Sequence, residues 1–161
     1  MTESERWYED GLPFSCTGCG NCCKRHGDAT HVYVREEEVL AIAEFLGRDP
    51  AAFLREELVV EDGWITLRPD LEQCPYLTED ARCGIYPVRP VQCRTWPFWD
   101  VNLQSEVWRR EVNGVCPGSR SGRLHDADTI DAIADATEDW YEGRLDAWPG
   151  LEPGGAGQLP E

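Results

Sequence analysis

The segment SCTGCGNCCKRHG, residues 15–27, places four cysteines within eight positions and follows them with Lys24, Arg25 and His26. These four follow the pattern C-x2-C-x2-C-C, and gaps of two residues let successive thiolates turn toward one centre. Two glycines inside the segment permit the φ-positive turns that such wrapping needs. The chain has eight cysteines, and these are Cys16, Cys19, Cys22, Cys23, Cys74, Cys83, Cys93 and Cys116.

Three uses of the cysteines compete. A disulfide framework needs an oxidising compartment, whereas the first residues, MTESERWYED, are acidic and lack the apolar core of a signal peptide. A thiol-exchange pair formed by Cys16 and Cys19 would need two cysteines rather than eight. Metal ligation uses all of them and is the favoured interpretation. Because adjacent side chains point apart, Cys22 and Cys23 suit either two centres or one centre with a spare thiol.

The distribution of charge supports the metal interpretation. Residues 11–27, 81–99 and 112–125 contain no Asp or Glu, although 31 of the 161 residues are acidic. These three stretches contain every cysteine except Cys74. They also contain seven basic residues, which are Lys24, Arg25, Arg82, Arg89, Arg94, Arg120 and Arg123. Four thiolates around Zn²⁺ or an iron–sulfur cluster keep a negative charge, which nearby cations stabilise and nearby carboxylates destabilise.

The whole chain is strongly acidic, with a formal net charge of −16. This charge disfavours nucleic acid and anionic membranes as partners. No run approaches the roughly 18 apolar residues that span a bilayer. We therefore expect a protein of the cytoplasm, where reducing conditions keep thiols available. The sequence does not indicate an oligomeric state.

Hydrophobic periodicity and turn residues predict short elements. A strand is expected at residues 31–34, helices at 35–47 and 50–57, and a hairpin at 58–67 that turns at Asp62–Gly63. Residues 73–99 are rich in proline and predict no long element, except for a turn of helix near Pro90. Helix is expected again at residues 105–112 and in a C-terminal helix at about 127–145, capped by Asp126 or Asp128.

The predicted fold is a small, loop-rich α+β domain with short helices, a small hairpin and a C-terminal helix. We expect cysteine–metal coordination to hold its loops. This single domain should cover residues 1–148, and residues 149–161 read as a flexible tail because they are rich in proline and glycine.

Four motifs together resemble the YkgJ-type cysteine-cluster family, and they are CTGCGNCC, CPYL, CGIYPVRPVQCRTWPF and CPG. The resemblance covers about residues 14–118 and implies a domain that chelates zinc or iron. All eight cysteines are candidate metal ligands. Cys74 and Cys116 each precede proline, as the last ligand of a bacterial ferredoxin run does. This favours an iron–sulfur cluster, of the 4Fe–4S type, over Zn²⁺.

Residues around the cysteines have secondary roles in this interpretation. Arg89 and Arg94 are expected to neutralise the site or to donate hydrogen bonds near sulfur. A group of aromatic residues should exclude water from it, namely Tyr86, Trp96, Phe98 and Trp99. His26 and His31 could replace a cysteine as ligands, but with eight cysteines present we expect them to be ordinary loop or strand residues.

The leading hypothesis is a metal-binding protein with one or two four-cysteine centres, iron–sulfur or zinc, and an electron-transfer or redox role if the metal is iron. In a two-centre arrangement, Cys16, Cys19 and Cys22 would share one centre with a later cysteine, and Cys23 would join the other. One rival is a protein-interaction module in which zinc is purely structural. A second is a thiol oxidoreductase that uses Cys22 or Cys23. No hydrolytic or nucleotide motif is present, so the sequence leaves open whether the protein is an enzyme.

Overall fold

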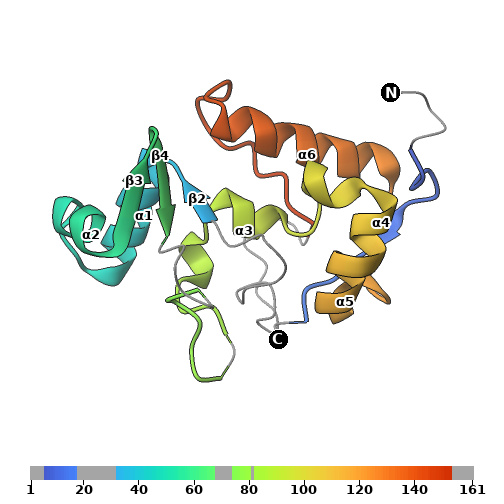
Figure 1. The fold of residues 1–161 in the computed structure, drawn as a ribbon, viewed down its shortest axis with the longest axis horizontal. Helices are drawn as coiled ribbons and strands as arrows, with labels where there is room; N and C mark the ends of the chain where they lie inside the picture. The colour runs from blue at the N-terminus through green and yellow to red at the C-terminus, as the bar shows by residue number, and fades with distance from the viewer. Residues whose placement is uncertain (1–5, 18–31, 68–73, 81, 154–161) are drawn as a thin grey trace. The chain divides into compact units, whose positions relative to one another are not determined.

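The described part of the protein consists of helices and two small antiparallel sheets, which confirms the predicted α+β class. The computed structural model describes residues 6–17, 32–67, 74–80 and 82–153 (Figure 1). The chain divides into two compact units, the first formed by residues 1–19 and 95–161 and the second by residues 20–94. The single domain proposed over residues 1–148 stays a prediction. Within the described residues, no helix is long and apolar enough to cross a membrane.

The second unit contains a three-stranded sheet in the order β2-β4-β3. Its strands are β2 (Val32–Val34), β3 (Leu58–Glu61) and β4 (Trp64–Leu67), and all neighbours are antiparallel. Asp62 and Gly63 join β3 to β4, with φ values of 53° and 83°. Positive φ at both positions is the geometry that an Asp-Gly hairpin turn requires, so the predicted hairpin is confirmed.

Helices α1 (Glu36–Leu46) and α2 (Pro50–Glu57) pack with this sheet, as Figure 1 shows. Both helices were predicted. Gly47 ends α1 with φ 69°, in the left-handed region that glycine favours. Asp49 caps α2, because its carboxylate accepts a hydrogen bond of 3.1 Å from the Ala52 N–H. The core of the unit contains Val34, Val39, Ile42, Ala43, Phe53, Leu58, Leu67 and Ile85.

The proline-rich segment that follows contains only short elements. An isolated bridge pairs Leu77 with Cys83, and two short helices follow, the 3-10 helix η3 (Tyr86–Val88) and α3 (Val91–Thr95). Helix α3 begins directly after Pro90, where the sequence predicted a turn of helix.

The first unit joins the N-terminal segment to the last third of the chain. Strand β1 (Leu12–Pro13) pairs antiparallel with β5 (Leu124–His125), a pairing that the sequence did not predict. A helical segment contains α4 (Ser105–Val107), the π-helix η5 (Trp108–Val112) and α5 (Asn113–Val115), so helix extends three residues beyond the predicted end. Two 3-10 turns flank it, η4 (Asp100–Leu103) and η6 (Pro117–Ser119).

The C-terminal helix α6 (Ala127–Tyr141) is capped by Asp126, whose carboxylate accepts a 2.8 Å hydrogen bond from the Thr129 N–H. It ends earlier than the predicted residue 145, because Gly143 adopts φ 76° and leaves the helical region. The core of this unit contains Leu12, Phe14, Trp96, Phe98, Leu103, Trp108, Val112, Cys116, Ile130, Ile133 and Ala134.

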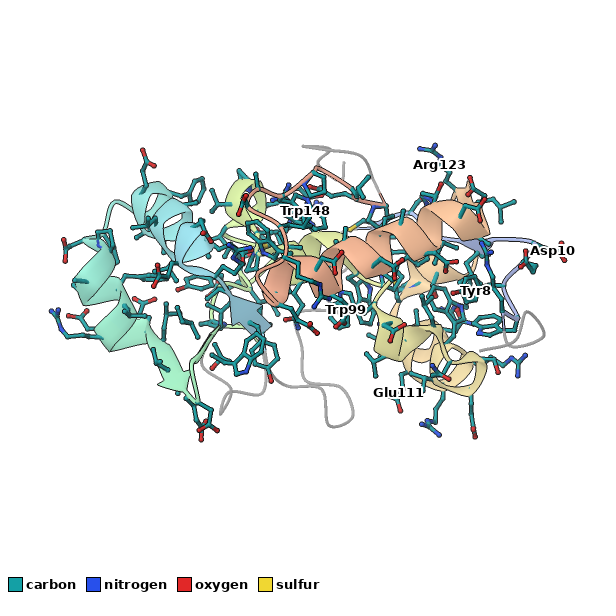
Figure 2. All side chains as sticks on the ribbon, turned by 90° about the horizontal axis from the view of Figure 1, so that it is seen from above. Tyr8, Asp10, Trp99, Glu111, Arg123 and Trp148 are labelled. Carbon is teal, nitrogen blue, oxygen red and sulfur yellow. The ribbon has the colours of Figure 1, made fainter. Side chains whose placement is uncertain are left out.

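An acidic stripe runs along α6, and its members are Asp128, Asp131, Asp135, Glu138 and Glu142. Arg6 forms ion pairs with Asp128 and Asp131 at one end. There Tyr8, which is labelled in Figure 2, also donates a 2.7 Å hydrogen bond to Asp131. In the middle, partial removal from water and the neighbouring carboxylates raise the pKa of Asp135 and of Glu138.

The cap of α2 gives a direct test of the local structure. We expect Asp49→Ala to lower the free energy of unfolding by about 1 kcal/mol, because the Ala52 N–H loses its acceptor. Asp49→Asn keeps a side-chain oxygen and should change stability little. Urea unfolding measures both variants, and equal losses would contradict the capping role.

The acidic stripe makes stability depend on pH. Because the pKa of Asp135 is raised in the folded protein, its charged form is destabilising above that pKa and the penalty disappears as the pH falls through it. Asp135→Asn should therefore raise the free energy of unfolding at pH about 7, and the gain should shrink under acidic conditions. Asp146→Asn removes an equal charge beyond the end of α6 and serves as the control. A gain that is independent of pH would contradict this account.

Candidate metal centre

The structure describes five of the eight cysteines, and they fall into two groups. Cys16 and Cys116 belong to the first unit, whereas Cys74, Cys83 and Cys93 belong to the second. No disulfide joins any two of these five. The other candidate ligands, Cys19, Cys22, Cys23, His26 and His31, lie outside the described residues, as do Lys24 and Arg25.

In the first unit, the backbone just before Cys16 lies against the turn that follows Cys116. Ser15 N–H donates to the Gly118 carbonyl over 3.1 Å, and Phe14 N–H donates to the Arg123 carbonyl over 2.8 Å. A Cβ on Gly118 would lie 1.8 Å from the Ser15 carbonyl oxygen, so this approach requires glycine. The contact brings together segments that are about a hundred residues apart in the sequence and that carry Cys16 and Cys116.

Cys116 is buried within the aromatic core of this unit. Its side chain packs in the cluster that contains Trp96 and Phe98, two of the aromatic residues expected to exclude water from the site. Trp99, the third residue of this group in the first unit, packs against the same cluster. The backbone is held as well, because the Cys116 N–H donates to the Val112 carbonyl over 2.8 Å and the Ser119 Oγ lies 2.7 Å from the Cys116 carbonyl.

A histidine outside the set of candidate ligands contacts the segment that leads into Cys16. His125 is buried, and its Nε2 lies 2.9 Å from the carbonyl oxygen of Phe14. The ring meets Phe98 edge to face, with 5.3 Å between the ring centroids. His125 therefore holds the segment that leads into Cys16. The sequence contained no signal for this contact.

In the second unit, Cys74 and Cys83 occupy the two sides of a tight hairpin-like loop. Leu77 N–H donates to the Cys74 carbonyl over 3.1 Å, and Gly84 N–H donates to the Tyr76 carbonyl over 2.7 Å. A Cβ on Gly84 would lie 2.9 Å from that same carbonyl, so glycine is needed here too. Both cysteines pack against the core of the unit.

Two side chains tie this loop to its surroundings. The Tyr76 hydroxyl donates a 2.8 Å hydrogen bond to the Glu57 carboxylate at the end of α2. Arg89 lies over the ring of Tyr86, with its guanidinium carbon 3.7 Å from the ring centroid, and its Nε donates to the Tyr86 carbonyl over 3.1 Å. The loop is thus fixed on one side to α2, and Arg89 is held in a defined position.

The pKa of the Cys83 thiol depends on burial and on several of its neighbours. Burial raises the pKa of the Cys83 thiol, and the neighbouring Cys74 raises it further. A hydrogen bond from the backbone of Ile85 and the positive charge of Arg89 act in the opposite direction. Cys74 and Arg89 are therefore near enough to influence the pKa of Cys83.

Cys93 lies in the middle of α3. Its N–H donates to the Pro90 carbonyl over 2.9 Å, and the N–H of Arg94, the second arginine expected to neutralise the site, donates to the same oxygen over 3.0 Å. The N–H of Val91 donates to the carboxylate of Glu38, a residue that no sequence pattern singled out.

The part of the chain that contains these loops matches a known protein family. A family model described as CxxCxxCC, "Putative zinc- or iron-chelating domain", matches residues 15–117, a range that includes all eight cysteines. The chain belongs to the CxxCxxCC family. No solved structure matches the chain. Zinc or iron chelation is therefore the activity that the CxxCxxCC match indicates for these cysteines.

The cysteine thiols among the described residues are suitable donors for zinc or iron. Within the described ranges, no three His, Cys, Asp or Glu side chains gather closely enough to hold a metal ion. These ranges do place Cys83 where burial and the neighbouring Cys74 disfavour its thiolate. A bound cation reverses this preference, because coordination deprotonates a thiol. Thiolates are ligands of structural zinc and of iron–sulfur clusters.

The close contact between Gly118 and Ser15 can be tested with two glycine variants. Gly118→Ala should lower the free energy of unfolding by about 3 kcal/mol, because its Cβ would overlap the Ser15 carbonyl and displace the backbone. At Gly114, in α5, an added Cβ would meet nothing within 4 Å. Gly114→Ala should therefore stabilise the protein by up to about 1 kcal/mol through helix propensity. Chemical denaturation compares the two, and a neutral Gly118→Ala would contradict the described contact.

Proposed function

We propose that this chain is a cytoplasmic metal-binding protein whose cysteines hold one or two four-cysteine centres, iron–sulfur or zinc. The observation that supports the proposal is the half-buried pair Cys74 and Cys83 within the family match, in a loop closed by backbone hydrogen bonds and next to Arg89. All eight cysteines are proposed ligands. The cytoplasm suits such a protein, because its reducing conditions keep thiols available for metal.

The contacts within each unit support a partial assignment of ligands. We assign Cys16 and Cys116 to the same centre, since the residue before Cys16 bonds to the turn after Cys116. We assign Cys74 and Cys83 to one centre as well, since both lie in one loop closed by backbone hydrogen bonds and Cys74 contributes to the raised pKa of Cys83. Arg89 and Arg94 are proposed to offset the negative charge of the thiolates.

The identity of the metal decides the role. An iron–sulfur cluster would supply one-electron chemistry, which would make the protein an electron carrier or a redox sensor. Four sulfur ligands around zinc leave no open position, so zinc would act as a structural element. The Cys-Pro pairs at Cys74 and Cys116 favour the 4Fe–4S alternative.

One observation favours a second function, a protein-interaction module with structural zinc. In the sheet of the second unit, β3 is an edge strand, and it exposes Val59 and Val60. Trp64 on the neighbouring strand is 43 % exposed. Exposed apolar residues on a sheet edge are features of surfaces that bind other proteins.

Metal analysis of protein prepared without oxygen separates these alternatives. An iron–sulfur centre should give a brown protein with broad visible absorption, with iron and sulfide in equal amounts. A colourless protein with stoichiometric zinc would select the structural role. Folded protein that contains neither metal, and whose thiols can all be titrated, would reject metal binding altogether.

Single Cys→Ser variants then identify the ligands. We expect Cys74→Ser and Cys83→Ser to lose metal together, and Cys16→Ser and Cys116→Ser to lose metal together, because each pair is assigned to one centre. Thr17→Ser is the control, because it alters an exposed residue next to Cys16 without removing a thiol. A Cys83 variant that keeps its full metal content would contradict the assignment of the second-unit loop.

A further inference from the structure

A buried carboxylate connects the first helix of the second unit to the helix that carries Cys93. Glu38 lies in the first turn of α1 and is only 9 % exposed. Its Oε1 accepts a 2.8 Å hydrogen bond from the Arg35 N–H, which is the local bond of a capping box. Its Oε2 accepts a 2.6 Å hydrogen bond from the Val91 N–H, which lies 53 residues further along the chain.

Capping of α1 does not account for this arrangement. A capping box requires a single side-chain oxygen, and an exposed carboxylate supplies it without being removed from water. Burial of a carboxylate is costly unless its oxygens accept hydrogen bonds. Glu38 therefore has a second structural task, and the Val91 N–H identifies α3 as the element concerned.

Helix α3 depends on such external contacts. It has five residues, and helices this short do not form on their own. Its first turn closes on the Pro90 carbonyl, which accepts from the N–H groups of Cys93 and Arg94. The N–H of Val91, the first residue of α3, donates to the Glu38 carboxylate. On the next residue, the Gln92 side-chain oxygen accepts a 2.9 Å hydrogen bond from the Tyr33 N–H of β2. Two side chains thus fix the backbone on which Cys93 is placed.

We propose that Glu38 is a positioning residue for the metal ligand Cys93, acting through the Val91 N–H and the first turn of α3. This inference rests on the proposed function, in which Cys93 binds metal. Glu38 itself touches no metal in this account. It holds the first turn of the helix that carries Cys93, so its loss weakens binding only as far as Cys93 contributes.

A double-mutant cycle tests this dependence with the zinc(II) ion as the probe. Glu38→Gln keeps the size of the side chain but replaces one acceptor oxygen with an NH₂ group, which leaves one of the two N–H groups without its bond. Glu36→Gln is the matched control, since it removes the same charge from the exposed first turn of α1. The affinity of metal-free protein for zinc, measured by competition with a chelator, is compared among the wild type, both Gln variants, Cys93→Ser and the Cys93→Ser/Glu38→Gln double variant.

We expect Glu38→Gln to weaken zinc binding about tenfold, in line with the loss of groups that orient metal ligands. Glu36→Gln should bind as the wild type does. Cys93→Ser should bind more weakly than Glu38→Gln, and the double variant should bind no more weakly than Cys93→Ser. Circular dichroism of the metal-free proteins checks that each is folded. If Glu38→Gln does not fold, Gln92→Ala replaces it in the cycle, because it releases the other attachment of α3.

The outcomes separate the two proposals. An equal loss from Glu38→Gln with and without Cys93 would overturn the positioning role and would leave Glu38 as a contributor to general stability. Wild-type affinity in Glu38→Gln would also overturn it. If Cys93→Ser binds zinc as tightly as the wild type does, the assignment of Cys93 as a ligand fails. If the wild type binds no zinc, the zinc form of the proposed function fails, and this inference fails with it.

Discussion

The structure depends on bringing backbone segments closer together than side chains would allow. At Gly118 a single methyl group would overlap the carbonyl of Ser15, and at Gly84 it would crowd the carbonyl of Tyr76. Each of these contacts lies next to a candidate ligand, Cys116 in the first unit and Cys83 in the second. A cysteine side chain is short, so thiols from distant segments can share a metal only if their backbones approach closely. Glycine next to the cysteines satisfies this requirement, and it ties the CPG and CGIYP motifs to backbone geometry as well as to sulfur chemistry.

The acidic residues are unevenly distributed along the chain. The stretches that contain Cys83, Cys93 and Cys116 lack carboxylates, whereas α6 carries a continuous acidic stripe. Along that stripe, partial removal from water and the neighbouring carboxylates raise the pKa of Asp135. A comparable set of acids beside Cys83 would add to the repulsion that Cys74 already exerts on it. Arg89, held over the ring of Tyr86, has the opposite effect. In the sequence, acidic residues are thus absent from the stretches that contain Cys83, Cys93 and Cys116, although Glu79 and Asp80 lie between Cys74 and Cys83.

The sequence predicted the elements whose signals are local. The apolar spacing of α1, the Asp49–Pro50 start of α2 and the Asp62–Gly63 turn each lie within a few residues of the structure they cause. The features that position the cysteines were not predictable in this way. Strands β1 and β5 have two residues each and show no periodicity, and the bond from Arg123 N–H to Ser15 Oγ joins residues 108 positions apart. Glu38 is the third of three consecutive glutamates, and only the tertiary structure distinguishes it from its exposed neighbours.

The tertiary contacts that position the cysteines matter for metal binding. The described cysteines lie in segments whose shape comes from hydrogen bonds and packing within the protein, such as the Cys74–Cys83 loop and the turn after Cys116. The same contacts fix the backbone on either side of the described cysteines, so they help to set the position of each thiol. The buried carboxylate of Glu38 belongs to the same scheme, because a short helix needs an external acceptor to hold its first turn. Positioning of the cysteines by ordinary backbone contacts is thus the principle that unites the glycines, the capping residues and the cysteines of this chain.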